Sequence, residues 1–256
     1  MHRVRGYKRE KMRENELSLE LLARLKSAQR VVALTGAGIS AESGLPTFRG
    51  NGGLWKKYKA EDLASIEGFL QKPDVVWEWY EYRRSIYAQA KPNAGHLALA
   101  EFEKIFPGFT LITQNTDGLH RMAGNENILE LHGSLRRNRC HSCGKLYPEK
   151  VEQNGKIPPR CACGGMLRPD VVWFGEPLSP FVLDKALEVS SRAEVFFSIG
   201  TSALVQPAAT LPLLARRKGA ALVEINIEET PLTSQADFFL RGTSSEWLGK
   251  IKERIV

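Results

Sequence analysis

A buried strand that runs directly into a glycine-containing turn is the feature that most constrains how this chain can fold. Residues 31–34 are four consecutive apolar residues, and the turn 35–38 (Thr-Gly-Ala-Gly) follows without a break. Such a short apolar run predicts a buried strand. Small residues in the turn let main-chain N–H groups approach a phosphate, and a following helix would add its positive dipole end. The pattern predicts a dinucleotide pyrophosphate site at residues 36–40.

The same strand-then-polar order recurs three more times along the chain. Polar loops follow predicted strands at the ends of 110–113, 195–199 and 221–225. Helices are predicted before and between these strands at residues 17–28, 73–90, 94–106, 181–190 and 211–218, with a closing helix over 245–256. Strands alternating with helices predict an α/β fold with a Rossmann-like, doubly wound parallel sheet. Ligands of such sheets collect where the strands end.

Length and charge restrict the class of protein. The chain has 256 residues, 43% of them hydrophobic, which suits one domain with a small insert. Much of the net charge of +7 comes from six lysines and arginines, with His2, within the first thirteen positions. We therefore interpret residues 1–16 as a basic flexible tail, and nucleic acid is not the expected main partner. The lack of a signal-length or membrane-length apolar run predicts a cytoplasmic protein without a membrane partner.

Four cysteines form two close pairs. Cys140 and Cys143 have two residues between them, and Cys161 and Cys163, with one residue between them, follow after a gap of seventeen residues. Such pairs in an intracellular protein predict one tetrahedral, structural zinc ion. The second pair is closer than usual, which leaves His141 as a possible substitute ligand. A redox-active dithiol is the less favoured alternative.

The predicted helix 73–90 carries a cation within an apolar stripe. One stripe contains Val75, Trp79, Tyr82 and Ile86, and the adjacent stripe contains Val76, Tyr80, Arg83 and Tyr87. Tyr80 and Arg83 are three residues apart and share a face of the helix. The pattern alone favours an arginine whose head group reaches solvent at the helix edge. The alternative is a cation that binds an anion.

Several motifs together resemble those of the sirtuin family, the NAD-dependent protein lysine deacylases. The resemblance begins at Gly36-Ala37-Gly38-Ile39-Ser40 and continues through residues 41–49 to Phe48-Arg49. It recurs in the same order at residues 114–117, 131–133, the cysteine pairs, 171–176, 200–202 and 226–228. These motifs span residues 20–245, nearly the whole chain.

The resemblance implies NAD as a co-substrate and assigns residues to it. Asn115 and Asp117 would hold the nicotinamide-ribose end, Asn226 and Glu228 the adenosine ribose, and Ser244 would lie near adenine. A loop at 50–53 would either cover the cofactor or be an ordinary surface loop. The complete implied set is Gly36, Ala37, Gly38, Ser40, Glu42, Phe48, Arg49, Trp55, Gln114, Asn115, Thr116, Asp117, Gly200, Thr201, Ser202, Asn226, Ile227, Glu228 and Ser244.

The resemblance also implies a reaction. His132 aligns with the catalytic base of the family, and Asn115 is the second catalytic residue. The acyl oxygen would displace nicotinamide from the ribose, and His132 would then take a proton from a ribose hydroxyl. The products would be nicotinamide, O-acyl-ADP-ribose and free lysine. His96 is expected to be a structural or capping histidine.

A third implication concerns the acyl group. In family members that remove acidic acyl groups, a Tyr-x-x-Arg pair binds the acyl carboxylate, and Tyr80 and Arg83 match it. Small Ala60 and Thr47 fit the same subgroup. Val172, Trp173 and Phe174 are the expected contacts to the substrate, which would add a strand to this segment. The resemblance thus implies deacetylation and also desuccinylation, demalonylation or deglutarylation.

The resemblance divides the chain into domains and leaves alternatives. Residues 17–134 and 170–256 would form the NAD-binding domain, and 135–169 the zinc-binding insert. Partners would be acylated-lysine proteins or peptides, and a monomer is favoured. The alternatives are NAD-dependent protein mono-ADP-ribosyl transfer and, less favoured, a basic zinc-ribbon protein that binds nucleic acid.

Overall fold

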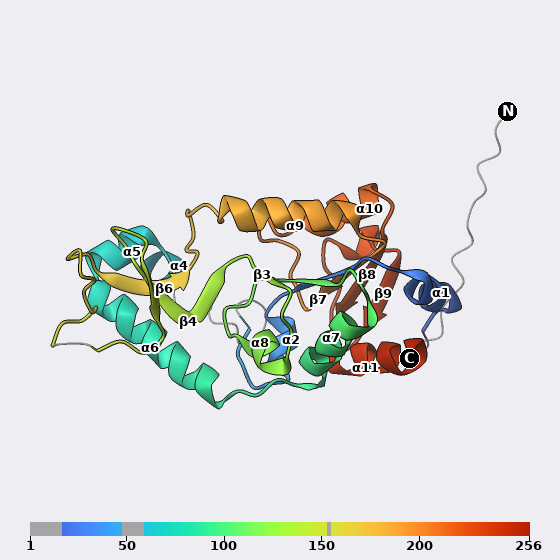
Figure 1. Ribbon diagram of the computed structural model, residues 1–256, viewed down its shortest axis with the longest axis horizontal. Helices are drawn as coiled ribbons and strands as arrows, with labels where there is room; N and C mark the ends of the chain where they lie inside the picture. Colours follow the sequence, from blue (N-terminus) through green and yellow to red (C-terminus); the bar gives the residue numbers. More distant parts are fainter. Residues whose placement is uncertain (1–16, 48–58, 153–154) are drawn as a thin grey trace.

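The computed structural model describes residues 17–47, 59–152 and 155–256, and its larger part is a three-layered α/β unit (Figure 1). A six-stranded sheet forms the middle layer, and all of its strand pairings are parallel. In spatial order the strands are β3 (Ile128–Glu130), β2 (Thr110–Thr113), β1 (Val31–Thr35), β7 (Val195–Ile199), β8 (Ala221–Asn226) and β9 (Phe238–Arg241). The predicted doubly wound parallel sheet is confirmed.

Helices cover both faces of this sheet, and they lie on opposite sides of it in Figure 1. One face packs against α1 (Leu19–Ser27), α7 (Ala94–Ile105) and α11 (Ser244–Ile255), and the other against α9 (Pro180–Arg192) and α10 (Thr210–Arg217). Side chains of a strand alternate between faces, so Val31 and Ala33 join the first core and Val32 and Leu34 the second. Burial on both faces explains the unbroken apolar run at the start of the sequence motif.

The order of the strands determines where a ligand site can form. In the sheet, β2 lies next to β1 on one side, and β7 lies next to β1 on the other side. Strand order therefore reverses at β1, and the loops after β1 and β7 turn to opposite faces of the sheet. A crevice opens at such a switch point, outside the carboxyl ends of the strands.

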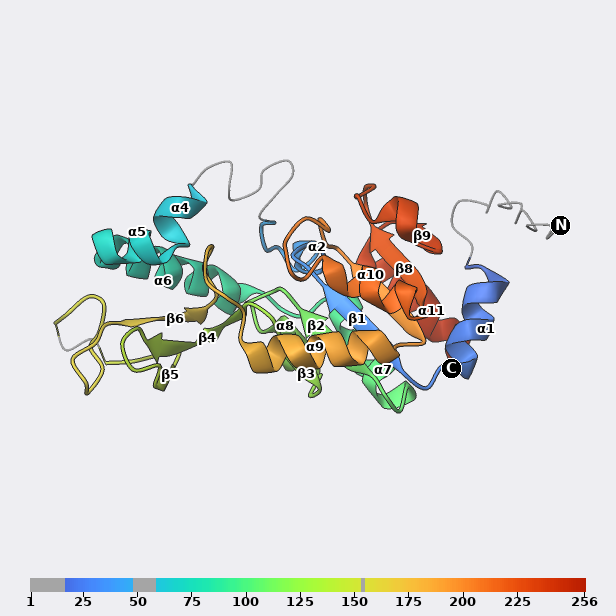
Figure 2. The same ribbon diagram turned by 90° about the horizontal axis from the view of Figure 1, so that it is seen from above.

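A second, smaller unit lies at one end of the molecule (Figures 1 and 2). It contains a three-stranded antiparallel sheet of β4 (Gly133–Cys140), β5 (Leu146–Pro148) and β6 (Leu167–Val171). Helices α4 (Ala60–Leu63), α5 (Ile66–Gln71) and α6 (Pro73–Gln89) lie beside this sheet. We call these strands and helices together the small lobe.

The small lobe has a hydrophobic core of its own. Phe69 of α5 and Tyr80 of α6 are buried in one cluster with Leu135 of β4 and Trp173, which follows β6. Helices from residues 60–89 therefore pack on β4 and on the segment after β6, a contact that the predicted insert 135–169 does not include. The domain division itself stays a prediction.

Helix α6 confirms one of the two predicted apolar stripes. Val76, Tyr80, Arg83 and Tyr87 are all buried. The other stripe is partly wrong, because Val75 is 46% exposed and Tyr82 is 58% exposed. The buried face instead extends to Trp77 and Arg84, and Arg84 donates hydrogen bonds to the Leu135 carbonyl and to Asn138 Oδ1 in the lobe sheet. The apolar pattern misplaced part of the buried face of α6, because it did not count Arg84 among the buried residues.

The remaining short elements of the described chain are α2 (Gly38–Ala41), α8 (Leu119–Ala123), the 3₁₀ turn η1 (Thr233–Gln235) and two isolated bridges, between Arg160 and Met166 and between Ser65 and Phe174. After β6 ends at Val171, Phe174 pairs with Ser65 in this bridge, and Phe174 N–H donates to the Ala64 carbonyl at 2.9 Å. No helix in the described part of the chain is both long enough and apolar enough to cross a membrane.

Candidate functional site

A cavity of about 1410 Å³ opens at the carboxyl ends of the parallel strands and extends to the small lobe. Loops after β1, β2, β7 and β8 line one part of it, and α6 with the segment after β6 lines another. The predicted site residues that line it are Gly36, Ala37, Gly38, Glu42, Tyr80, Arg83, Gln114, Asn115, Thr116, His132, Val172, Trp173, Phe174, Gly200, Thr201, Ser202, Asn226, Ile227, Glu228 and Ser244.

The turn after β1 interlocks with the turn after β7. A Cβ on Gly38 would lie 2.7 Å from Gly200 Cα, and a Cβ on Gly36 would lie 2.8 Å from the Gly200 carbonyl oxygen. Gly200 itself has φ +58°, in the left-handed region that favours glycine. The contact between the two turns therefore requires the three glycines, whether or not a phosphate binds there.

Two amides of the predicted phosphate turn are already engaged. Gly36 N–H donates to the Ile199 carbonyl at 3.0 Å, and Gly38 N–H donates to the Gly200 carbonyl at 2.9 Å. Helix α2 spans only Gly38–Ala41, so its dipole is that of a single turn. The pyrophosphate position stays a prediction, and other atoms of this turn would have to provide its contacts.

Asn115 belongs to a buried hydrogen-bond cluster behind the cavity wall. Its amide Nδ2 donates to the Gly36 carbonyl at 3.0 Å and to Ser40 Oγ at 3.2 Å. Ser40 Oγ in turn donates to Asp117 Oδ2 at 2.8 Å, while Asp117 Oδ1 accepts from Leu119 N–H. Burial raises the pKa of Asp117, and the two hydrogen bonds oppose that shift. Asn115 lines the cavity in a fixed orientation, whereas Ser40 and Asp117 lie behind it and support Asn115.

A pair of buried histidines lies next to this cluster. His96 caps α7, because its Nδ1 accepts from Asn93 N–H at 3.3 Å while Asn93 Oδ1 accepts from the first turn, a reciprocal capping box. The predicted capping role is confirmed. The His96 and His120 rings have centroids 4.8 Å apart, and His120 Nε2 contacts Thr35 Oγ1 at 2.9 Å. Burial lowers the pKa of His96 to about 4 and lowers that of His120 well below its ordinary value.

Because burial keeps these two histidines neutral in the folded protein, we expect the free energy of unfolding to decrease in mild acid. Unfolding would return His96 to a pKa near 6.5, so between about pH 6.5 and pH 4 the unfolded chain binds more protons than the folded one. Stability is therefore present above pH 6.5 and is lost as the pH falls toward 4. From His96 alone, the free energy of unfolding should drop by about 2 kcal/mol between pH 7 and pH 5. Urea unfolding at the two pH values measures this difference.

The matched variant is His96→Gln, since glutamine also serves in a capping box. Its unfolding free energy should depend on pH less steeply by about the same 2 kcal/mol. An unchanged pH dependence in this variant would contradict the assignment.

His132 lies in the turn between β3 and β4. Its Nδ1 is 3.1 Å from the Gln114 carbonyl oxygen. A carbonyl only accepts, so we assign the proton to Nδ1, which leaves Nε2 as the nitrogen that can accept a proton. Burial lowers the pKa of His132, although the Gln114 hydrogen bond opposes this. The ring that lines the cavity is therefore a neutral base at neutral pH.

The loop that follows β8 is part of the cavity wall, and it is held by buried Glu224, a residue that the sequence motifs did not indicate. The fully buried carboxylate of Glu224 accepts from Thr230 Oγ1 at 2.5 Å and from Thr233 Oγ1 at 2.6 Å. This fixes the loop that contains Glu228. A charged residue inside the apolar run 221–225 was the available signal.

The other contacts around this loop connect predicted residues to one another. Asn226 Nδ2 donates to the Thr201 carbonyl at 2.8 Å, and Ser244 Oγ donates to Glu42 Oε2 at 3.3 Å. The first bond joins the ends of β7 and β8, and the second joins the start of α11, after β9, to the segment after α2.

The small lobe contributes an aromatic and cationic wall. Trp173 Nε1 donates to Tyr80 Oη at 2.8 Å. The Arg83 guanidinium carbon lies 5.0, 5.5 and 5.2 Å from the ring centres of Trp79, Tyr80 and Tyr87, and Arg83 also donates to the Tyr87 hydroxyl. Arg83 is buried, so the reading of an arginine whose head reaches solvent is wrong.

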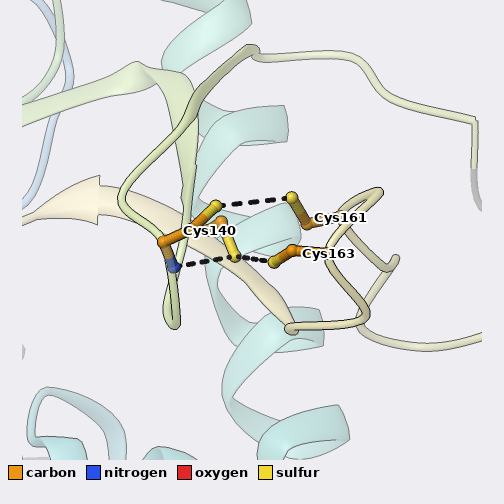
Figure 3. Close-up of side chains that lie close together, drawn as sticks. Cys140, Cys161 and Cys163 are labelled. Carbon is orange, nitrogen blue, oxygen red and sulfur yellow. Dashed lines mark hydrogen bonds between the residues drawn. The ribbon is translucent and has the colours of Figure 1, made fainter.

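The four cysteines converge, and Figure 3 shows the thiols of Cys140, Cys161 and Cys163 turned toward one another. All four sulfur atoms lie within 4.8 Å of one another. Cys140 Sγ is 3.5 Å from Cys163 Sγ, and Cys143 Sγ is 3.7 Å from Cys161 Sγ. Sulfurs bound to one tetrahedral zinc at 2.3 Å are about 3.8 Å apart, so this set fits the ion despite the close spacing of the second pair. His141 instead packs its ring against Phe69.

Four predicted contacts remain outside this description. Phe48, Arg49 and Trp55, together with the loop 50–53, lie outside the described residues, as does the side chain of Ala60. Thr47 lies at the cavity wall. The roles given to the lining residues stay predictions. The structure brings these residues together in one cavity.

The chain matches the family model described as the Sir2 family over residues 36–207. It is 51% identical over 222 residues to a protein from Aquifex aeolicus (strain VF5) named NAD-dependent protein deacylase, covering 86% of this chain and 93% of that protein. A solved Sir2 homolog–NAD complex is 48% identical with a TM-score of 0.87, covering 94% of each chain. A solved complex of Sir2, p53 peptide and NAD+ is 34% identical with a TM-score of 0.83, covering 92% of this chain and 97% of that one.

Proposed function

Because this chain belongs to the Sir2 family, we propose that its cavity removes acyl groups from protein lysines with NAD as co-substrate. The products are nicotinamide, O-acyl-ADP-ribose and free lysine. The resemblance inferred from the motifs is thereby confirmed at the level of the family. The observation that carries the proposal is the neutral His132 ring, which lines the strand-end cavity with Nε2 as its proton acceptor.

The described residues fit a dinucleotide in this cavity. Its volume of about 1410 Å³ accommodates a molecule of that size beside a peptide. The buried Thr116 Oγ1 has no hydrogen-bond partner within the described residues, and Thr116 is part of the cavity wall. A bound ligand with polar groups would satisfy it. When bound, NAD supplies the sugar carbon to which the acyl oxygen is transferred.

The protein's own contribution is orientation and proton transfer. Asn115 is held by Gly36 and Ser40, so its amide is fixed before a ligand arrives. His132 Nε2 takes a proton from a ribose hydroxyl, and the Gln114 carbonyl holds Nδ1–H and stabilises the resulting cation. Incubation with NAD and an acetyl-lysine peptide, followed by mass spectrometry, tests the proposal. Absence of O-acyl-ADP-ribose would refute it.

The zinc ion has a structural part in this proposal. Four thiolates would fill all its coordination positions, which leaves none for a substrate or water. The alternative reaction, transfer of ADP-ribose to protein, is not favoured by the named relatives, and the same mass spectra would reveal ADP-ribosylated peptide. Monomeric, cytoplasmic protein without a nucleic-acid partner remains part of the proposal, and a reducing compartment would keep the four thiols available for zinc.

We further propose that acidic acyl groups are among the substrates. Tyr80 and Arg83 line the lobe part of the cavity, and three aromatic rings surround the guanidinium. A buried arginine is strongly stabilised by a carboxylate, because its planar fork matches two oxygens. A succinyl, malonyl or glutaryl group ends in such a carboxylate, whereas an acetyl group does not.

Substituting Arg83→Met tests this preference. We expect kcat/KM for a succinyl-lysine peptide to fall roughly 10- to 100-fold, because a charge-assisted hydrogen bond in a buried site is lost. Turnover of the matched acetyl-lysine peptide should change by less than about threefold on the same grounds. The exposed Tyr82→Phe on the same helix is the control and should change neither rate. Equal losses for both peptides would show that Arg83 has only a structural part.

A further inference from the structure

The direction of the hydrogen bond between Trp173 and Tyr80 determines what Tyr80 can do. An indole N–H is only a donor, so at 2.8 Å the Tyr80 oxygen must be the acceptor. The hydroxyl hydrogen of Tyr80 therefore points to a different acceptor. Both side chains are only 2% exposed, which restricts the directions that this hydrogen can take.

Tyr80 also keeps its hydrogen over the physiological range. Burial raises the pKa of Tyr80 above its ordinary value, although nearby Arg83, the Trp173 hydrogen bond and Arg168 oppose this. A neutral phenol whose oxygen already accepts a hydrogen bond is a donor toward the cavity that it lines. An anionic group at the end of an acyl chain is an acceptor of the right kind.

An ion pair between buried Arg168 and partly buried Glu176 holds the Trp173 ring in place. The Arg168 guanidinium carbon lies 3.4 Å from the centre of the indole, and Arg168 is only 3% exposed. Its Nη1 and Nη2 donate to the two oxygens of Glu176 at 2.5 and 2.8 Å, and Nη2 also donates to the Val171 carbonyl at 2.7 Å. A flat guanidinium on the face of tryptophan fixes the plane of the ring.

The same ion pair fixes the main chain of Trp173. Glu176 Oε2 accepts from Trp173 N–H at 2.8 Å. Backbone and ring are therefore both held by Arg168 and Glu176, two charged residues that flank the apolar segment 171–174. Removing one member of this pair would leave the other charge without its partner, and the hydrogen bonds of that residue would be disturbed.

We propose that Trp173 sets acyl specificity through its N–H, by orienting the Tyr80 hydroxyl as a donor to the acyl carboxylate, and that Arg168 is the positioning residue that holds Trp173. This inference rests on the proposed acidic-acyl function. It differs from a lining role for Trp173, because the effect comes from one N–H group and not from the size of the ring.

Binding measured by calorimetry without NAD tests the inference apart from catalysis. The probes are two peptides of one sequence, with succinyl-lysine or acetyl-lysine. Trp173→Phe removes the N–H and keeps an aromatic ring, so its Kd for the succinyl peptide should rise about 3- to 10-fold, as for one lost hydrogen bond. Its Kd for the acetyl peptide should change less than twofold. Arg168→Lys, which keeps the charge but loses the flat stack, should shift the ratio of the two Kd values in the same direction.

The matched control is Trp77→Phe. Trp77 is also buried and has the Arg84 guanidinium 5.6 Å from its ring centre, but its Nε1 has no hydrogen-bond partner among the described residues. This variant should leave the ratio of the two Kd values unchanged. Comparing this variant with Trp173→Phe separates the loss of a hydrogen-bonded N–H group from the loss of ring volume.

A double-mutant cycle decides between orientation and packing. In a Tyr80→Phe background there is no hydroxyl to orient, so Trp173→Phe should cause no further rise in the succinyl-peptide Kd. An undiminished rise there, equal losses for both peptides, or a parental protein that does not prefer the succinyl peptide would each overturn the inference. Absence of NAD-dependent turnover with the Kd pattern intact would instead refute the deacylase proposal alone.

Discussion

Replacing His132 by tyrosine is expected to lower kcat/KM for every acyl-lysine peptide by roughly 10²- to 10⁴-fold, the contribution of a positioned general base. His132 has Nδ1 held by the Gln114 carbonyl and a pKa lowered by burial, so Nε2 is available as a base at neutral pH. Tyrosine has no neutral group that accepts a proton in this range. Mass spectrometry of O-acyl-ADP-ribose formation measures the loss.

A variant with a smaller side chain tests whether the tyrosine ring lowers the rate by blocking the cavity. His132→Asn should show a loss of similar size, while its affinity for NAD, measured by calorimetry, should stay within about threefold of the parental value because the main chain of the turn is unchanged. Retention of more than a tenth of the parental rate by both variants would remove His132 from the mechanism. The Arg83→Met variant, which affects only acidic acyl groups, would remain a separate test.

Loss of the zinc ion should have the second largest effect. Cys140 and Cys161 are buried in one cluster with Trp77 of α6 and Leu167 of β6, so the four-thiol site joins the central strand β4 and the edge strand β6 to the helix. A structural zinc site contributes its binding free energy to folding. Cys161→Ser should lower the free energy of unfolding by at least about 3 kcal/mol and abolish deacylation with it.

Elemental analysis and urea unfolding measure this effect, with His141→Gln as the control. His141 packs on Phe69 and is not part of the four-thiol cluster, so this variant should keep about one zinc ion per chain. A Cys161→Ser protein with full zinc content and unchanged stability would contradict the four-thiol site. Zinc loss in His141→Gln would restore the histidine as a substitute ligand.

The fold could be predicted from sequence because its strands are short apolar runs that end in polar residues. That pattern follows from burial on both faces, as Val31 to Leu34 show. The motifs also predicted most of the residues that line the cavity, because the carboxyl ends of parallel strands lie at one edge of the sheet.

Residues behind the cavity wall could not be assigned in this way. Ser40 and Asp117 bond to each other beneath Asn115 and do not line the cavity, and their contact with NAD stays a prediction. Sequence spacing does not reveal which side chain of a polar loop faces the ligand and which supports it. Arg168 and Glu176 were missed for a related reason, since their pairing depends on a turn of the chain after β6.

The histidine turn has a mechanical consequence for the enzyme. Residues 131–133 are the link by which the chain leaves β3 of the large sheet and enters β4 of the small lobe. Val172 N–H donates to the His132 carbonyl at 3.0 Å, so the outgoing and returning links are tied together at that point. A displacement of the small lobe transmitted through these two links would also displace the main chain of His132, whose ring lines the cavity.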